Sequence, residues 1–508
     1  LIVGNELLVS ATAYQQQRVV TADLEASYAY DNEGKMTGMH HPSSLGSNIT
    51  GDTYSYGFDS LGRPVGLTDQ TTMQTAVSGV TYGPAGEMLT INYGGVNETR
   101  TYNNLLQLTA LSAYHFGRQY SYSGTANNGK IQSETDTVSG ETVTYQHDKL
   151  TRLMQATSNS ASAPWGQSFA YDGFGNLTDK GVTSGSAPTY HTTFDPATNR
   201  EYGAPYDANG NRVAIPGMNL GYDIENRMVT ALPPLTSSTE EVYSYGRGNR
   251  RVYAAHWQWD GTTYYLFSQK VYFYSVTGQK LGTYQLGLND PPPGQGTPSL
   301  SFAQLETRMW FGGKLVMANG NPVAPDRLGS LGRYYPYGED RTPPAVPNDR
   351  EKFATYTRDS ATGLDYAVNR YYYNVSGRFM SADPYVNSAG PKEPGSWNRY
   401  AYTRGDPTNR IDPSGLDDSG CGAFDEDFCE DSPILDGGTF NDPLNLGVAP
   451  QGMVNIQCDM LPGSSVGGLC TVSDEAYQML VGNYTVSDAQ LAQILLEGGI
   501  GAVCAGSG

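Results

Sequence analysis

The stretch Phe353–Leu416, FATYTRDSATGLDYAVNRYYYNVSGRFMSADPYVNSAGPKEPGSWNRYAYTRGDPTNRIDPSGL, is dense in tyrosine, arginine, glycine and Asp-Pro pairs. Asp-Pro and glycine favour turns, whereas tyrosine suits a half-buried strand, where its ring packs on neighbours and its hydroxyl reaches water. The stretch therefore predicts short strands joined by tight turns. The chain before it looks like a series of repeats, and the chain after it has a different composition.

The composition of the whole chain agrees with this interpretation. Its 508 residues include 61 glycines and 38 tyrosines, and only 16% are charged. Such a chain can bury a large core, and its length alone suggests about two to four domains, although repeats weaken that rule. The composition is unlike that of a standard enzyme and predicts an all-β protein.

Residues 1–250 contain variants of a Tyr-Asp-x-x-Gly-(Arg/Asn)-apolar motif. Clear copies begin at Tyr30, Phe58, Tyr171, Tyr206 and Tyr222. Most steps between the repeat tyrosines span 20 to 26 residues; these tyrosines are Tyr30, Tyr56, Tyr82, Tyr102, Tyr122, Tyr145, Tyr171, Tyr206, Tyr222 and Tyr245. This loose period indicates an array of similar units.

One copy explains the geometry of the unit. The β-prone stretch Gln167–Tyr171 ends at Asp172, whose carboxylate can accept bonds from turn amides, and Gly175 suits a positive-φ position before the next strand begins at Leu177. One hairpin cannot bury its own face, so successive copies must pair edge to edge. We expect YD-repeat hairpins that spiral into a shell or barrel-like cage, and further hairpins over residues 251–325.

The last part of the chain, residues 417–508, has a different character. It holds fourteen Asp or Glu and no Lys, Arg or His, so it carries −14 of the net charge of −20. This acidity argues against a nucleic-acid partner, because phosphate binding needs clustered basic residues. Two short helices are expected over residues 474–481 and 488–497, since a Ser487–Gln490 capping box precedes the second. We expect a small α-containing appendage.

All the cysteines of the chain fall in this tail. Without a CxxC pair or a histidine, they fit disulfide bonds in an exported protein better than a zinc site. The disulfide candidates are Cys421, Cys429, Cys458, Cys470 and Cys504. The alternative is five unpaired cysteines in a reducing cell.

The region from Asp326 to Leu416 resembles the core domain of Rhs/YD-repeat proteins, a family that includes bacterial polymorphic toxins, insecticidal toxin-complex shells and teneurins. The ordered series that carries the resemblance is Asp326–Ser330, Tyr335–Glu339, Thr362–Tyr366, Asn369–Tyr372, Gly377–Pro384, Asn398–Tyr402 and Asp406–Leu416. The sequence departs from the family at Tyr373-Asn374 and at Asp406, which we interpret as turn variants. The expected domains are the array at 1–250, continuing hairpins at 251–325, the core at 326–416 and a variable region at 417–508.

The resemblance implies that the core is an autoprotease that uses two aspartates. The family's roles fall on Asp383 and Asp412, with Leu416–Asp417 as the cleaved bond. A nearby arginine, Arg378 or Arg370, could orient the site. Two close carboxylates cannot both ionise easily, so one can keep a proton while the other activates water. Asp-Pro also forms turns anywhere, so both aspartates could hold loop amides instead.

The first functional hypothesis is an exported bacterial shell protein, secreted or on the cell surface, that encloses or displays its C-terminal region. The second is an extracellular structural or adhesive protein whose tail contacts neighbouring subunits. A toxin in residues 417–508 ranks last, because nucleases and transferases rely on His, Lys or Arg. The expected partners are the chain's own C-terminal segment or neighbouring subunits, with carbohydrate as a further candidate.

Other sites and segments are not expected. The scattered histidines predict no metal site and no cofactor. The chain begins Leu1-Ile2-Val3 with no Met and no positively charged region before an apolar run, so no signal peptide is visible. It contains no run of eighteen apolar residues that could span a membrane.

Overall fold

The computed structural model of the whole chain describes residues 2–3, 6–15, 18–44, 49–233, 239–262, 264–289, 299–341, 348–384, 394–416, 419–420, 453–457 and 469–473. The chain divides into two compact units, Leu1–Ile434 and Leu435–Gly508. The described residues form strands and short 3-10 turns without an α-helix, so the predicted all-β class is confirmed. The predicted helices of the tail lie outside the described residues.

The first sheet has 17 strands, and each strand pairs antiparallel with the next one in the chain. They are β1 (Ile2–Val3), β2 (Glu6–Gln15), β3 (Arg18–Tyr30), β4 (Met36–Ser43), β5 (Thr53–Phe58), β6 (Pro64–Asp69), β7 (Gln74–Tyr82), β8 (Met88–Tyr93), β9 (Val96–Tyr102), β10 (Leu108–Ala113), β11 (Phe116–Tyr122), β12 (Ile131–Asp136), β13 (Thr142–His147), β14 (Leu153–Ser158), β15 (Trp165–Tyr171), β16 (Leu177–Gly185) and β17 (Tyr190–His191).

The second sheet has ten strands with the same sequential antiparallel pairing. They are β18 (Ala214–Ile215), β19 (Met218–Tyr222), β20 (Met228–Leu232), β21 (Thr239–Tyr245), β22 (Arg251–Trp259), β23 (Tyr264–Tyr274), β24 (Lys280–Asn289), β25 (Ser299–Phe311), β26 (Lys314–Ala318) and β27 (Asn321–Pro322), with the 3-10 turn η1 (Arg247–Asn249) between β21 and β22. We call β1–β27 the strand array.

We call residues 326–416 the plug segment, and the described part of it contains only short elements. These are η2 (Phe353–Thr355), β28 (Thr357–Arg358), β29 (Asp365–Ala367), β30 (Arg370–Tyr373), β31 (Arg378–Phe379), η4 (Pro394–Trp397), η5 (Thr403–Gly405) and β32 (Arg410–Ile411), which pairs with β33 (Ser419–Gly420). In the second unit, β34 (Met453–Gln457) pairs with β35 (Leu469–Ser473).

The repeat motif builds the turns and also links one turn to the next hairpin. In the turn after β5, Oδ1 of Asp59 accepts the backbone N–H of Leu61 and of Arg63, both at 2.9 Å, and Gly62 has φ +80°. The guanidinium of Arg63 lies 4.5 Å from the ring centre of Tyr82, and the Tyr82 hydroxyl donates to the carbonyl of Pro64 at 2.6 Å. Each tyrosine therefore packs under the turn of the preceding hairpin.

The same contacts recur along the array. Arg152 lies over Tyr171, Arg227 over Tyr245 and Arg250 over Tyr274, and the three hydroxyls donate to backbone carbonyls of preceding strands. The recurring arginine and tyrosine thus link neighbouring hairpins through cation–ring contacts and hydroxyl–carbonyl hydrogen bonds.

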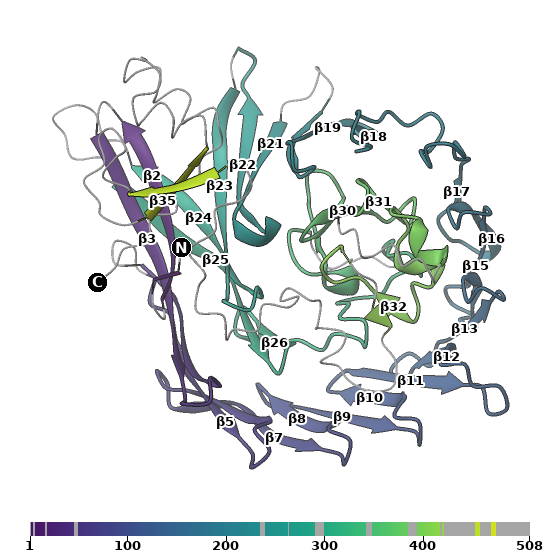
Figure 1. Cartoon of the computed structure of the whole chain (residues 1–508). Helices are drawn as coiled ribbons and strands as arrows, with labels where there is room; N and C mark the ends of the chain where they lie inside the picture. The colour runs from purple at the N-terminus through teal and green to yellow at the C-terminus, as the bar shows by residue number, and fades with distance from the viewer. Residues whose placement is uncertain are drawn as a thin grey trace. The chain divides into compact units, whose positions relative to one another are not determined.

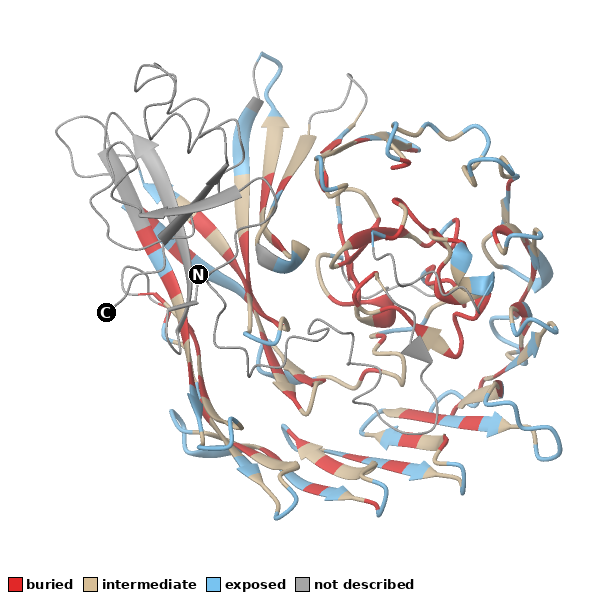
Figure 2. Cartoon of the chain, in the orientation of Figure 1, coloured by how far each residue is buried: buried red, intermediate tan, exposed pale blue. Residues whose placement is uncertain are grey.

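The plug segment packs against both sheets of the first unit. One buried cluster joins Leu153, Phe169 and Leu177 of the array to plug residues such as Tyr372, and another joins β19–β23 to Tyr371. Figure 1 shows the plug segment, in green, with strands from β11 to β22 lying around it. Buried residues are dense in this segment and alternate with exposed ones along the array strands (Figure 2).

Candidate functional site

Arg370 brings the two predicted aspartates together. Its Nη2 lies 3.0 Å from Oδ2 of Asp412 and 3.6 Å from Oδ2 of Asp383. All three residues are buried, at 7% exposure or less. Two carboxylates that are far apart in the sequence therefore share one guanidinium.

Short strands of the plug segment position these groups. Arg370 is the first residue of β30, Asp383 follows β31, and Asp412 follows β32 directly. The carbonyl of Arg399 accepts the N–H of Asp383 at 2.9 Å and Nη1 of Arg370 at 3.0 Å. The guanidinium of Arg370 also packs on the ring of Phe379, at 3.6 Å from the ring centre. Packing on this ring and bonding to this carbonyl fix the guanidinium between the two carboxylates.

Asp412 also holds the turn that precedes the predicted cleavage bond. Its Oδ1 accepts the N–H of Leu416 at 2.9 Å, and the N–H of Gly415 donates to the Asp412 carbonyl at 3.2 Å. The repeat turns make the same two bonds, from the fifth residue to the aspartate side chain and from the glycine to its carbonyl. One oxygen of Asp412 thus serves the turn and the other faces Arg370, so the turn role and a catalytic role are compatible.

The predicted cleavage bond lies in the connection between two paired strands. β32 and β33 lie on either side of the turn, with Ile411 opposite Ser419. Leu416, before the bond, is half-buried, while Asp417, after it, lies outside the described residues. The side chains of the five cysteines, and so the disulfide prediction, also lie outside them.

Arg378 has different surroundings from Arg370. Its guanidinium donates to Oδ1 of Asn176 and to the carbonyl of Asn199, and it packs between the rings of Phe194 and Tyr400, at 4.7 and 4.3 Å from their centres. Burial lowers the pKa of this guanidinium. Arg378 therefore connects the plug segment to the array, and the bridging position belongs to Arg370.

Sequence reasoning missed two residues next to this site. The hydroxyl of Tyr356 donates to the carbonyl of Asp412, and Asn369 bonds to the carbonyl of Ser414. Burial raises the pKa of the Tyr356 hydroxyl well above its ordinary value, with the nearby Asp412 adding to the effect, so this hydroxyl keeps its proton and donates. No spacing in the sequence distinguishes these two residues from the many other tyrosines and asparagines.

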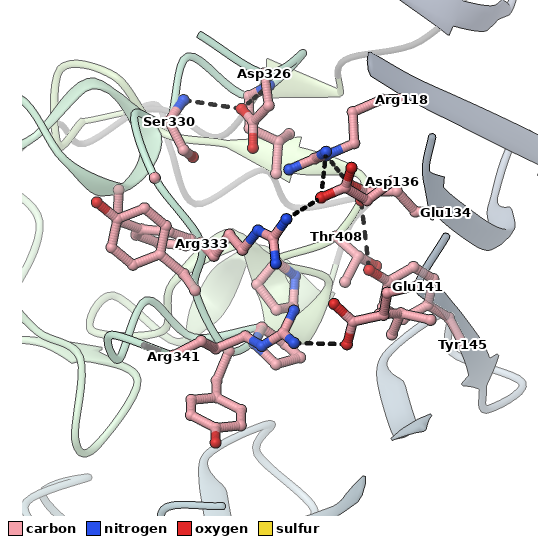
Figure 3. A pocket seen from close by; sticks show the side chains of 18 of the residues that line it. Arg118, Glu134, Asp136, Glu141, Tyr145, Asp326, Ser330, Arg333, Arg341 and Thr408 are labelled. Carbon is pink, nitrogen blue, oxygen red and sulfur yellow. Dashed lines mark hydrogen bonds and ion pairs between the residues drawn. The ribbon is translucent and has the colours of Figure 1, made fainter. Parts of the chain in front are cut away.

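A second polar site lies where the plug segment meets β11–β15. A cavity of about 90 Å³ is lined there by charged and aromatic side chains (Figure 3). Arg333 donates to Oδ2 of Asp136 and Arg341 to Oε1 of Glu141, both at 2.6 Å. Because these arginines already have carboxylate partners, the cavity marks an ion-pair network that fastens the plug segment to the array.

The described residues contain no group of three or more His, Cys, Asp or Glu side chains that could hold a metal ion. None of their helices is long and apolar enough to cross a membrane.

The sequence is similar to parts of much longer curated proteins, and no family model matches it. It is 25% identical over 287 residues to the tRNA3(Ser)-specific nuclease WapA of Bacillus spizizenii, and 25% identical over 288 residues to the tRNA nuclease WapA of Bacillus subtilis. Each match covers 53% of this chain but 12% of the relative. The chain thus spans about an eighth of the length of these relatives.

The fold is similar to that of solved toxin-complex structures. The crystal structure of TcdB2-TccC3-Cdc42 matches 81% of this chain with a TM-score of 0.58 and 19% identity, and the match covers 23% of that chain. The Photorhabdus luminescens Tc holotoxin pore matches 80% with a TM-score of 0.55 and 18% identity, covering 22% of that chain. These matches confirm the resemblance drawn from the repeat motif and the plug segment: the chain has the β-shell fold of the Rhs/YD-repeat proteins.

Proposed function

We propose that this chain is the C-terminal part of an exported shell protein. The shell encloses or displays the variable C-terminal region, and the chain cuts itself once, after Leu416. The observation that carries the proposal is the Arg370 bridge between Asp383 and Asp412, beside the turn that leads into the Leu416–Asp417 bond. Export, enclosure and cutting are all parts of the proposal.

The geometry supports hydrolysis by a carboxylate pair. One guanidinium cancels one of the two carboxylate charges, and a single proton on the pair would balance the other. The protonated carboxyl then donates to the carbonyl oxygen of Leu416 while the other carboxylate takes a proton from the attacking water. A C–O bond forms, the C–N bond to Asp417 breaks, and the leaving amine takes up a proton. The reaction happens once per chain.

The relatives support a shell that this chain does not complete by itself. The solved structures combine two named components, TcdB2 and TccC3, and this chain covers less than a quarter of the matched chain. We propose that other shell strands, from a longer form of this chain or from a partner subunit, complete the enclosure. We do not transfer the nuclease activity of the WapA relatives to residues 417–508, because they contain no His, Lys or Arg.

Intact-mass spectrometry under denaturing conditions tests the proposal. The wild type should give two chains, one ending at Leu416 and one beginning at Asp417, whereas Asp383→Asn and Asp412→Asn should give a single uncut chain. Asp406→Asn is the matched control, because Asp406 is an equally buried Asp-Pro aspartate that pairs with Lys130 instead of Arg370. It should be cut as the wild type is.

An uncut wild-type chain would remove the autoprotease and leave the extracellular structural or adhesive role as the better hypothesis. Equal cutting of the wild type and Asp412→Asn would exclude Asp412 from the reaction.

A further inference from the structure

The turn Asp412–Leu416 precedes the proposed cleavage bond, and we call it the cleavage turn. The turn between β29 and β30 contacts it through an unusual pair of hydrogen bonds. Both the backbone N–H and the Nδ2 of Asn369 donate to the carbonyl of Ser414, at 3.1 and 3.0 Å. The next residue, Arg370, donates from Nε to the carbonyl of Gly415. Two consecutive residues, one in the turn and one at the start of β30, therefore bind two consecutive carbonyls of the other turn.

These bonds extend along the chain toward the cleavage bond. The carbonyls of Ser414 and Gly415 are held by Asn369 and Arg370, and the N–H of Leu416 is held by Oδ1 of Asp412. The carbonyl of Leu416 is the next one along the chain, and it is the carbonyl that the proposed reaction attacks. A slip of one residue would place a different carbonyl against the carboxylate pair.

The backbone on both sides of this contact has restricted geometry. Val368 has φ +57°, a left-handed conformation that β-branched residues rarely adopt and that costs conformational energy. Gly415 has φ +70°, and a Cβ on it would lie 2.5 Å from the carbonyl oxygen of Ala367. The two turns thus touch backbone to backbone, which leaves no room for a shifted register. Strained backbone of this kind persists where the surrounding structure holds it in place.

We propose that Asn369 is a positioning residue for the self-cleavage reaction, and that the Asn369–Ser414 contact sets which peptide bond is cut. This proposal rests on the proposed function, because a register matters only if the chain is cut. Asn369 acts through the substrate backbone, whereas Asp383 and Asp412 act on the reacting atoms.

A time course of cell-free synthesis of the full chain tests the proposal, with intact mass giving both the fraction cut and the position of the cut. In Asn369→Ala the backbone N–H bond remains and the side-chain bond is lost. We expect cutting about 10-fold to 100-fold slower, as for a reacting group displaced by about 1 Å, and additional cuts beside residue 416. Asn369→Asp keeps the shape of the side chain but turns an acceptor toward an acceptor, so it should be at least as slow.

Asn374→Ala is the matched control, because Asn374 is a buried amide of the same segment that bonds to Asp365 and not to the cleavage turn. It should cut at the wild-type rate and position. A purely structural role for Asn369 would lower thermal stability without moving the cut. If the wild type is cut while Asn369→Ala and Asn369→Asp cut at the same bond and rate, the positioning role is wrong and the proposed function stands. If the wild type is not cut, both are wrong.

Discussion

The two carboxylate oxygens of Asp412 make different contacts, one with the turn and one with Arg370. The turn beside Asp412 is closely packed. Oδ1 holds the N–H of Leu416 and Oδ2 faces Arg370. Between these contacts, Gly415 has a positive φ and lies against the carbonyl of Ala367. Even one added methyl group at Gly415 should therefore displace the turn from Arg370.

We predict that Gly415→Ala stops cutting after Leu416. The added Cβ would lie 2.5 Å from the Ala367 oxygen, so the turn must move away from Arg370. Gly363→Ala is the matched control, because Gly363 has a similar φ of +69° with nothing within 4 Å of the added Cβ. The control should lose about 1 kcal/mol of stability from backbone strain alone and should still be cut. Intact mass and urea unfolding measure both effects, and equal behaviour of the two variants would show that the clash has no role.

The resemblance to the Rhs/YD-repeat core assigned the aspartate roles to Asp383 and Asp412, while the sequence left Arg370 and Arg378 as alternatives. Both arginines belong to short strands rich in aromatic residues, and only the folded hairpin decides which one points to the carboxylates. Asn369 belongs to a segment that carries the resemblance, but the sequence did not indicate its contact, which depends on the backbone conformation of Val368 and on a turn 45 residues away. Local sequence patterns predict the turns, whereas the contacts between turns depend on the tertiary fold.

At the scale of the hairpin, the hydrogen bonds of a repeat tyrosine depend on whether the plug segment packs against it. The Tyr82 hydroxyl donates to the carbonyl of Pro64, in the array. The Tyr171 hydroxyl contacts three groups: the carbonyl of Leu153 at 2.8 Å, the hydroxyl of Tyr337 at 2.6 Å and the carbonyl of Gly405 at 3.1 Å. Tyr171 thus joins two hairpins and the plug segment.

We predict that Tyr171→Phe costs more stability than Tyr82→Phe. The second change removes the bond to the Pro64 carbonyl and should cost about 0.5–1.5 kcal/mol. The first leaves the buried Tyr337 hydroxyl and the Gly405 carbonyl short of a partner, which should raise the loss to about 2–3 kcal/mol. Urea unfolding of both variants measures the difference. Equal losses would mean that the plug contact adds nothing to the repeat contact.

Much of the strand array could be predicted at this scale. The repeat motif predicts a turn at Asp59 and a positive φ at Gly62. The hairpins can therefore be predicted from the local sequence. The packing between sheets could not be predicted: Leu24 and Met39 of the first sheet share a buried cluster with Phe273 and Phe302 of the second. These residues are more than 200 positions apart and follow no common period, so only the path of the whole chain brings them together.

At the scale of the whole first unit, a buried ion pair connects the array to the plug segment. Arg251, which is 1% exposed, binds both oxygens of Asp359, at 2.6 and 2.7 Å, and its Nη1 also donates to the hydroxyl of Tyr371. Lys270 and Asp349 form a more exposed pair between the same two parts, at 3.1 Å.

We predict that Arg251→Met lowers the stability of the unit by about 3–5 kcal/mol, because Asp359 is left buried without its cation. Lys270→Met should cost less than about 1 kcal/mol, since water screens the exposed pair. The double change Arg251→Met with Asp359→Leu should cost less than the sum of the single changes. Thermal unfolding of Arg251→Met, Asp359→Leu, their double variant and Lys270→Met measures these differences, and additive losses would contradict a coupled pair.

The stability of the whole unit should also depend on pH through His41. This residue is 6% exposed, its ring lies 4.9 Å from that of Tyr54, and its Nε2 has no hydrogen-bond partner among the described residues. Burial lowers the pKa of His41 from 6.5 to about 4. Between pH 6.5 and about 4, His41 therefore binds a proton in the unfolded chain but stays neutral in the folded chain.

We predict that the stabilisation from neutral His41 is fully present above pH 6.5 and is lost as the pH falls toward 4, up to about 3 kcal/mol. His41→Phe keeps a ring beside Tyr54 but cannot be protonated, so the difference in unfolding free energy between wild type and variant should shrink or reverse across this range. His115→Phe, in the exposed turn between β10 and β11, should keep the wild-type slope. Urea unfolding at pH 7, 5.5 and 4.5 gives the three slopes. A variant slope equal to that of the wild type would place the acid sensitivity of the unit in other groups, since the packing around His41 would then tolerate its charge.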